Sequence, residues 1–140
     1  MQGLSLEDLS VGQCSEMTHS VTEADIIGFA DITGDRNPVH LDHDYARNTA
    51  FGSRIAHGML SAGYISAVIG NQLPGPGAIY LSQSLRFRRP VRIGDTVTAR
   101  VEVVAINNGR ARVTLATSCL VNGEVVVDGQ AEIQAPRRGA

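Results

Sequence analysis

Residues 35–40, Asp-Arg-Asn-Pro-Val-His, place a carboxylate and an imidazole five positions apart on either side of a proline. Pro38 fixes its own φ, lacks an amide donor and disfavours helical geometry at Asn37. We therefore expect Asp35 and His40 on a bent, extended segment rather than on a helix face. An acid/base pair that a turn aims at one point can activate water. The alternative is an aspartate that caps the turn and a histidine that packs in the core.

Two helices are predicted around this segment. Residues 22–25 match a capping box that starts a helix at Thr22, and Gly34 ends it just before Asp35. Residues 58–73 form a second helix, rich in small and apolar side chains on every side, which stops where proline and glycine cluster at 71–77. Such a helix requires burial.

Four strands are predicted in the C-terminal half. Apolar residues alternate with polar ones over 79–88, 97–103, 111–119 and 125–133, the period of half-buried strands. Asn107-Asn108-Gly109 and Asn122-Gly123 separate the last three at hairpin spacing, because Asn and Gly tolerate the positive φ of tight turns. The last three strands should form an antiparallel meander, and a curved sheet around one long buried helix satisfies both patterns.

Three ordered blocks carry a family resemblance: FADITGDRNPVHLD at 29–42, IAHGML at 55–60 and FRRPVRIGDTV at 87–97. With them, the chain resembles the (R)-specific enoyl-CoA hydratases of the MaoC-like family from about Leu6 to Ile133. The resemblance implies an α+β hot-dog fold, as a single domain over residues 1–140. It also implies a hydro-lyase that adds water reversibly, with syn geometry, to trans-2-enoyl-CoA and gives (R)-3-hydroxyacyl-CoA.

Further implications of the resemblance concern assembly and metabolism. The sheets of two copies would join edge to edge in a homodimer, with the acyl pocket at or near the subunit interface. The product would enter fatty-acid metabolism or supply monomers for polyhydroxyalkanoate synthesis. A hot-dog thioesterase, or an acyl-CoA-binding partner subunit without catalysis, are the alternatives.

Candidate roles follow from what hydration of an unsaturated thioester needs. Asp35 is the candidate base, and by resemblance it acts with His40 around one water molecule; which of them passes the proton to C2 stays open. Gly58 opens the second helix, so its free amide can hold the thioester oxygen. His57 beside it either contacts the substrate or forms a local hydrogen bond.

Asn37 and Ser66 complete the set of candidate site residues. Asn37 either holds the turn or orients the acid/base pair through its amide. Ser66 lies where the resembling hydratases carry a serine beside the catalytic pair, so it is a candidate partner of Asp35, although a serine in an apolar helix usually bonds its own backbone.

Two competing sites are disfavoured. Residues 40–44 have the composition of a metal site, but the alternating order splays the ligands. A nucleophile triad of Ser66, His57 and Asp35 lacks the G-x-S-x-G elbow that exposes a nucleophile. We therefore expect no metal and no cofactor. The resemblance implies a CoA thioester as substrate, and an acyl carrier protein stays open as the alternative carrier.

Composition excludes several classes of protein. The 140 residues carry a formal net charge of −2, which argues against nucleic acid as a partner. All 12 residues counted as Lys or Arg are arginines, so lysine-dependent Schiff bases and P-loops are excluded. A dense group of arginines is a candidate for the CoA phosphates, although exposed arginines often serve only solubility. Its members are Arg86, Arg88, Arg89 and Arg92.

Location and cysteine chemistry are also predicted. Neither a signal-peptide-like apolar run nor a membrane-length apolar stretch is present, so we expect a cytoplasmic protein without membrane contact. Cys14 and Cys119 lack a CxxC partner and are predicted to be small buried hydrophobes.

Overall fold

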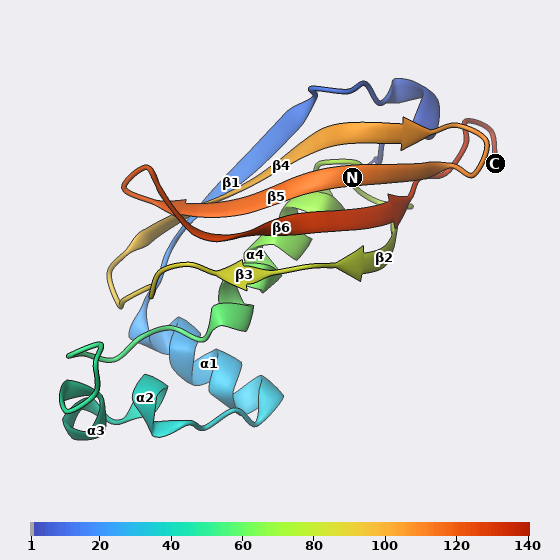
Figure 1. Cartoon of the computed structure of the whole chain (residues 1–140). Coiled ribbons are helices and arrows are strands. Elements are labelled where there is room, and N and C mark those ends of the chain that lie inside the picture. The colour runs from blue at the N-terminus through green and yellow to red at the C-terminus, as the bar shows by residue number, and fades with distance from the viewer. Residues whose placement is uncertain (1) are drawn as a thin grey trace.

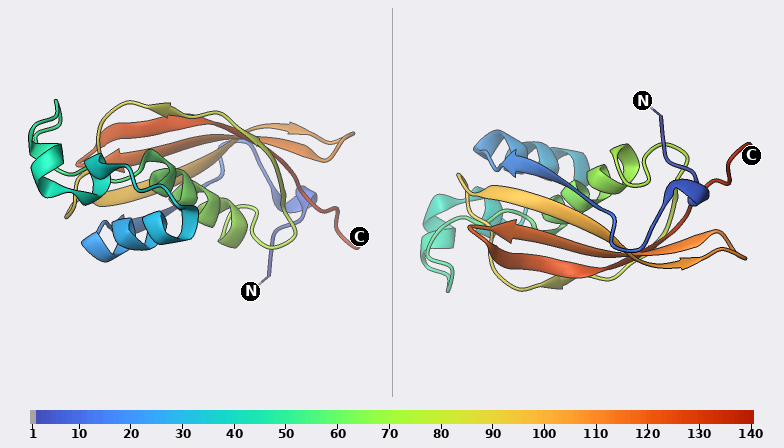
Figure 2. Two further views of the ribbon diagram at one scale, coloured as in Figure 1. Left: turned by 90° about the horizontal axis from the view of Figure 1, so that it is seen from below. Right: turned by 90° about the horizontal axis from the view of Figure 1, so that it is seen from above.

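The computed structural model describes residues 2–140 as one antiparallel sheet with all four α-helices on the same side (Figure 1, Figure 2). The strand order is β1-β4-β5-β6-β2, and β3 also pairs with β6. In chain order the elements are η1 (Leu6–Asp8), β1 (Cys14–Ser20), α1 (Glu23–Thr33), α2 (Pro38–Leu41), α3 (His43–Arg47), α4 (Gly58–Asn71), β2 (Ile79–Gln83), β3 (Arg86–Phe87), β4 (Thr96–Asn107), β5 (Arg112–Val121) and β6 (Glu124–Gln134).

The predicted meander is confirmed as β4, β5 and β6, which pair antiparallel in sequence order. Their inward residues are fully buried, among them Val101, Val113 and Ile133. Asn122 and Gly123 have the positive φ expected of a tight turn. In the β4–β5 turn the positive φ belongs to Ala111, so the role predicted for Gly109 is wrong.

Strand β1 was not predicted, because its sequence CSEMTHS is polar on both faces. It pairs along its whole length with β4 and forms one edge of the sheet. Cys119 is buried as expected, but Cys14 is exposed on this edge strand, so its predicted burial is wrong.

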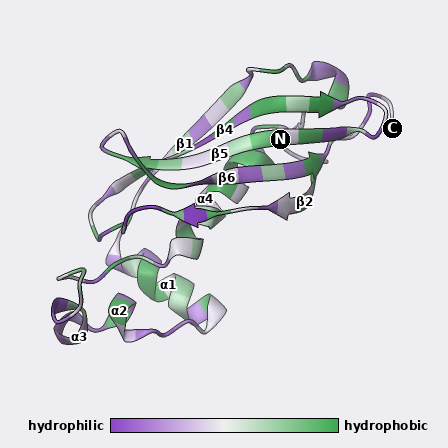
Figure 3. Ribbon diagram, viewed as in Figure 1, coloured by the Kyte–Doolittle hydropathy of each residue, from purple (hydrophilic) through white to green (hydrophobic). Residues whose placement is uncertain are grey.

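The single half-buried strand predicted over 79–88 is divided into β2 and β3. Between them the chain runs beside β6 so closely that a Cβ on Gly129 would lie 1.9 Å from the carbonyl oxygen of Ser84. Ile79, Leu81 and Phe87 are 53%, 42% and 54% exposed, because β2 and β3 pair with β6 on one side only. Figure 3 shows hydrophobic stretches in β4 and a hydrophilic β3.

Helix α4 crosses the inner face of the sheet and contacts β1, β4, β5 and β6. Ile65, Val68 and Ile69 carry the packing and are at most 2% exposed. The prediction that the whole helix is buried is wrong for the chain alone, because a stripe on its opposite face is exposed. This α4 stripe consists of Met59, Gly63, Ser66 and Gly70.

Helices α1 and α4 begin and end near the residues predicted from sequence. Thr22 and Asp25 form the predicted capping box of α1, and Gly34 ends that helix with φ 81°. Among residues 2–140 no helix has the length and apolarity to cross a membrane.

Candidate active site

Asp35 lies in the loop between α1 and α2, directly after the glycine that ends α1. Its amide donates to Thr33 Oγ1 at 3.1 Å, and that hydroxyl donates to the carbonyl of Phe29 at 2.7 Å. The Asn37 amide donates to Asp35 Oδ1 at 3.3 Å. The carboxylate remains exposed in the single chain. The backbone of this loop is therefore well held, while the carboxylate stays accessible.

His40 lies on the short helix α2, so the prediction of an extended segment is wrong for residues 38–41. Proline at the first helical position loses no hydrogen bond and has a suitable φ, which is why Pro38 starts this helix instead of preventing it. The Asn37 side chain accepts from the Val39 amide at 3.2 Å and caps the helix. Asn37 thus holds the turn with its side chain and approaches Asp35 with its backbone. The short helix buries His40, which is 8% exposed.

Side chains from three segments meet at this point. A carboxylate oxygen of Asp35, a ring nitrogen of His40 and a ring nitrogen of His57 all lie within 4.8 Å of one another. The rings of His40 and His57 are stacked, with centroids 3.9 Å apart and planes 29° apart. Phe29 packs against His57 at 4.7 Å between ring centroids. Segments that are distant in sequence thus deliver one compact acid/base cluster.

The hydrogen bonds of the two histidines set their tautomers. His40 Nδ1 donates to the carbonyl of Ile55 at 2.7 Å, and His57 Nε2 donates to the carbonyl of Asp35 at 3.0 Å, because a carbonyl oxygen can only accept. In the neutral rings, His40 Nε2 and His57 Nδ1 are therefore acceptors. His57 is 2% exposed, and its Nδ1 has no partner among residues 2–140.

The pKa of His40 is lowered, first by burial and then by the neighbouring His57. The Ile55 carbonyl and the Asp35 carboxylate oppose this change. The balance favours a neutral imidazole, whose Nε2 lone pair can accept a proton or a hydrogen bond from water.

Gly58 is the first residue of α4, with His57 as its N-cap. The His57 side chain does not bond the first-turn amides, so they are not capped by it. A Cβ on Gly58 would lie 2.6 Å from Phe87 Cε1, so glycine is required by the ring that covers it. Gly58 lines a cavity, and the His57 side chain does not cap the helix start, so the Gly58 amide can bond an anionic oxygen in that cavity.

Two hollows reach these residues, and Met59 lines both. The first, the Gly58 cavity, has a volume of about 450 Å³ and is lined by His40, Phe51, Ile55, Ala56, His57, Gly58, Met59, Ser61, Phe87, Arg88, Arg89, Pro90, Val91 and Val127. The second, the Asp35 groove, has a volume of about 610 Å³ and is lined by Phe29, Thr33, Asp35, Met59, Ala62, Gly63, Ser66, Tyr80, Gln83 and Leu85. The two histidines thus line the Gly58 cavity, and Asp35 lines the Asp35 groove on the other side of Met59.

Ser66 lines the Asp35 groove as predicted, but no hydrogen bond joins it to Asp35 in the described part of the chain. The predicted proximity of Asp35, His40 and His57 is found, and Gly58 lines the same cavity as the two histidines. Ser66 belongs to the same groove without direct contact.

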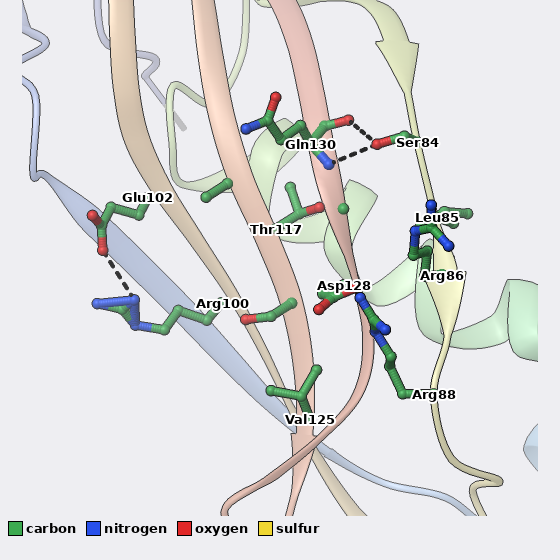
Figure 4. Close-up of a pocket in the computed structure, with 13 residues that line it drawn as sticks. Ser84, Leu85, Arg86, Arg88, Arg100, Glu102, Thr117, Val125, Asp128 and Gln130 are labelled. Carbon is green, nitrogen blue, oxygen red and sulfur yellow. Dashed lines mark hydrogen bonds and ion pairs between the residues drawn. The ribbon is translucent and has the colours of Figure 1, made fainter.

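A larger hollow of about 750 Å³ lies on the opposite face of the sheet (Figure 4). It is lined mainly by polar side chains that satisfy one another, such as Arg100 with Glu102 at 3.2 Å. None of the acid/base residues lines it. Its size alone therefore does not make it the site of chemistry.

The acid/base cluster has the residue types of a metal site but an unsuitable geometry. A metal bonded to both imidazoles lies about 2.0–2.1 Å from each nitrogen and in the plane of each ring. The two rings are stacked, with planes 29° apart, so their nitrogen lone pairs do not converge on one point at that distance. The arrangement suits hydrogen bonding to a shared water better than coordination.

Arg54 was missed by sequence reasoning. Its Nε donates to the carbonyl of His40 at 2.7 Å, and its guanidinium pairs with Glu23 of α1 at 2.7 Å. With only 13% of its side chain exposed, Arg54 fixes α2 against α1. Nothing in its sequence context distinguishes it from the other arginines. Phe29 and Thr33, by contrast, lie within the first of the three sequence blocks.

Comparisons with known proteins agree with this site. The family model described as "MaoC like domain" matches residues 11–125. An (R)-specific enoyl-CoA hydratase of Rhodospirillum rubrum is 53% identical over 95% of this chain and 92% of its own length. A 3-hydroxybutyryl-CoA dehydratase of Methylorubrum extorquens is 52% identical over 96% of this chain and 86% of its own.

A solved structure shows that the similarity extends to three dimensions. The unliganded R-hydratase of Pseudomonas aeruginosa superposes with a TM-score of 0.92 at 50% identity, covering 97% of this chain and 88% of that one. Its fold and that of this chain are the expected hot-dog fold, an antiparallel sheet with a helix packed against it. The chain therefore belongs to the MaoC-like domain family.

Proposed function

We propose that this protein is an (R)-specific enoyl-CoA hydratase, a hydro-lyase that converts trans-2-enoyl-CoA reversibly to (R)-3-hydroxyacyl-CoA. The observation that carries the proposal is the cluster of Asp35, His40 and His57, with the open amide end of α4 beside it. Relatives of more than 50% identity that bear hydratase and dehydratase names support it, since these name the two directions of one reaction.

The proposed reaction uses one water molecule between Asp35 and His40. Asp35 acts as the base, and His40 Nε2, left free by the bond of Nδ1 to Ile55, orients the same water. The hydroxyl adds to C3 and a proton is delivered to C2 on the same face. His57 positions both partners, because it stacks on His40 and bonds the backbone of Asp35.

Negative charge on the thioester oxygen is assigned to the Gly58 amide. The first amides of a helix lack intrahelical acceptors and lie at the positive end of the helix dipole. A glycine here leaves room for the Phe87 ring, so the start of α4 keeps its position beside the cavity. Such a donor stabilises the enolate-like transition state more than the ground state.

A homodimer is proposed on the basis of two exposed apolar surfaces. Ile79, Tyr80 and Leu81 of β2 are exposed at a sheet edge that has no partner strand within the described residues. An apolar sheet edge left open invites pairing with a second copy. Met59 of the α4 stripe is 54% exposed and borders the Asp35 groove. A second copy that covers β2 would also enclose this groove.

No metal or redox cofactor takes part in the proposed reaction. The carboxylate, imidazole and amide supply the base, the water-orienting group and the oxyanion donor that hydration needs. Activity should therefore persist after prolonged treatment with EDTA. The cytoplasmic location and the supply of polyhydroxyalkanoate monomers stay predictions.

The test is an assay with crotonyl-CoA, chosen because one close relative is named for the four-carbon substrate. Loss of the conjugated enoyl absorbance without release of free thiol, with (R)-3-hydroxybutyryl-CoA as product, is the expected result. Thiol release would identify a thioesterase instead. Binding of enoyl-CoA without turnover, across longer chains as well, would identify a partner subunit without catalysis.

A further inference from the structure

The Gly58 cavity changes in character from one end to the other. Its inner end is formed by His40, His57 and Ser61, each at most 8% exposed. Its outer end is exposed and includes two consecutive arginines, Arg88 and Arg89, next to the Phe87 ring. The cavity thus leads from the acid/base cluster to a positively charged rim.

Only two of the four clustered arginines belong to this rim. The guanidinium of Arg92 donates to the carbonyl of Phe51 at 2.8 Å and to the hydroxyl of Ser53, so it holds the loop beside the cavity. Arg86 and Arg88 both line the hollow on the outer face of the sheet (Figure 4), but Arg86 does not line the Gly58 cavity, whereas Arg88 lines both. Of the four arginines, only Arg88 and Arg89 therefore line the Gly58 cavity.

The two rim arginines retain donors for a further anion. Arg88 Nε pairs with Asp128 at 3.1 Å, and Arg89 pairs with Glu124 at 3.1 Å. Both arginine side chains are more than half exposed, so these pairs are screened by water and exchange readily. A guanidinium has five N–H donors, and each arginine uses few of them here. A neighbouring hollow of about 520 Å³, also lined by Arg88 and Arg89, extends the rim outward.

The other side of the acid/base cluster has the opposite character. The Asp35 groove is lined by Phe29, Met59, Ala62 and Leu85 and by no basic residue. An acyl chain suits that groove, and a phosphate does not. Charge complementarity therefore gives the substrate a direction through the site.

We propose that Arg88 and Arg89 form the subsite for the phosphates of the CoA carrier. The thioester lies at Gly58, the acyl chain runs past Met59 into the Asp35 groove, and the pantetheine arm leaves through the Gly58 cavity to the arginine rim. Paired guanidinium groups match phosphate oxygens with charge-assisted hydrogen bonds. This inference rests on the hydratase function proposed above.

The experiment compares two thioesters of the same enoyl group. Crotonyl-CoA carries the phosphates, and crotonyl-N-acetylcysteamine ends before them. For Arg88→Ala and Arg89→Ala, the ratio of kcat/KM for the CoA ester to that for the truncated ester should fall about ten-fold each, through KM. This ratio cancels general damage to the fold or to the catalytic groups. Arg86→Ala is the matched control, because Arg86 shares the outer-face hollow with Arg88 but does not line the Gly58 cavity, and it should keep the wild-type ratio.

Two further measurements vary the ionic strength and the carrier of the crotonyl group. The KM of the wild-type protein for crotonyl-CoA should rise with ionic strength, and that of the double variant should rise less. A wild-type ratio in both single variants and in the double variant would overturn the inference. So would a loss confined to crotonyl esters of an acyl carrier protein. If the wild-type protein hydrates neither ester, the proposed function itself fails, which is a different result from an unchanged ratio.

Discussion

The two halves of the active site differ in how completely one chain builds them. His40 and His57 are almost fully buried, stacked on each other and bonded to backbone carbonyls. Asp35 and Ser66, on the other side of Met59, are exposed in an apolar groove. The imidazole half of the site, His40 and His57, is therefore organised by the fold of the single chain. The carboxylate half has its backbone fixed but requires a cover, which we assign to the second copy and the substrate.

The largest expected effect comes from the exposed half. Asp35→Asn keeps the shape of the side chain but removes the base, so kcat should fall about a hundred-fold or more. Thermal unfolding should change little, because the carboxylate is exposed and, among residues 2–140, accepts only the 3.3 Å bond from the Asn37 amide. Steady-state kinetics with crotonyl-CoA and a melting curve measure both quantities.

Asp31→Asn is the matched control for this prediction. Asp31 is an exposed aspartate of α1 that pairs with Arg36 at 2.7 Å and lines neither hollow of the site. It should retain wild-type kcat. An active Asp35→Asn protein would refute the assignment of Asp35 as the base.

The second prediction concerns the point where the two halves meet. Gly58→Ala forces a methyl group to within 2.6 Å of Phe87 Cε1, so the ring or the start of α4 must move. Overpacking of this kind costs about 1–3 kcal/mol of stability. Displacement of the oxyanion amide should lower kcat about a hundred-fold. Urea unfolding and steady-state kinetics separate the two effects.

Two further variants test the cause of this loss. Gly28→Ala, on α1 with nothing within 4 Å of the added methyl, should stabilise the protein by about 0.5–1 kcal/mol and leave kcat unaltered. Gly58→Ala combined with Phe87→Leu removes ring atoms from the collision. Partial recovery of both stability and kcat is expected, because the amide can return to its place; recovery of stability alone would show that displacement of the amide is not the cause of the lost activity.

The fold was largely predictable because its strongest signals are local. Alternating apolar residues defined β4, β5 and β6, while Thr22 and Gly34 marked the ends of α1. Strand β1 was not predictable because a polar edge strand carries no alternation. Alternation over 79–88 misled about burial, since it reflects a face that the single chain leaves uncovered. The proposed homodimer would cover this face and account for the alternation.

The residues of the site were predictable, but not the contacts between them. Asp35, His40 and Gly58 stood out by type and position. The stacking of His57 on His40 and its bond to the Asp35 carbonyl depend on tertiary structure. Arg54 gave no signal at all, because an arginine that bonds a distant carbonyl looks like any other arginine in the sequence.

The third prediction tests the missing cover directly. Leu81→Lys places a charge on the exposed edge of β2 without altering a residue that lines either hollow. The variant should elute as a monomer in size-exclusion chromatography, because edge lysines oppose strand pairing. Its activity should fall several-fold as the Asp35 groove opens. Ile32→Lys, at an 88% exposed position on α1, is the control. A fully active monomeric Leu81→Lys protein would show that one chain suffices.

The smallest expected effect belongs to the buried half and concerns pH. Burial lowers the pKa of His40 in the folded protein below its ordinary value of 6.5. As the pH falls through about 6.5, the unfolded chain therefore takes up a proton at His40 before the native protein does, and the free energy of unfolding decreases. Above that pH both states are neutral and the effect vanishes. Stability should thus rise with pH across the window below 6.5.

Replacement of His40 isolates its share of this dependence. Urea unfolding at pH 7.5 and pH 5.5 should show a smaller decrease for His40→Gln than for the wild-type protein, although His40→Gln is less stable at both pH values because it loses the bond to the Ile55 carbonyl. His43→Gln, at an exposed position on α3, should leave the pH dependence as it is in the wild-type protein. An equal decrease in His40→Gln and in the wild-type protein would mean that the imidazole is not held neutral by burial. Burial would then not distinguish the electrostatics of His40 from those of the exposed half of the site.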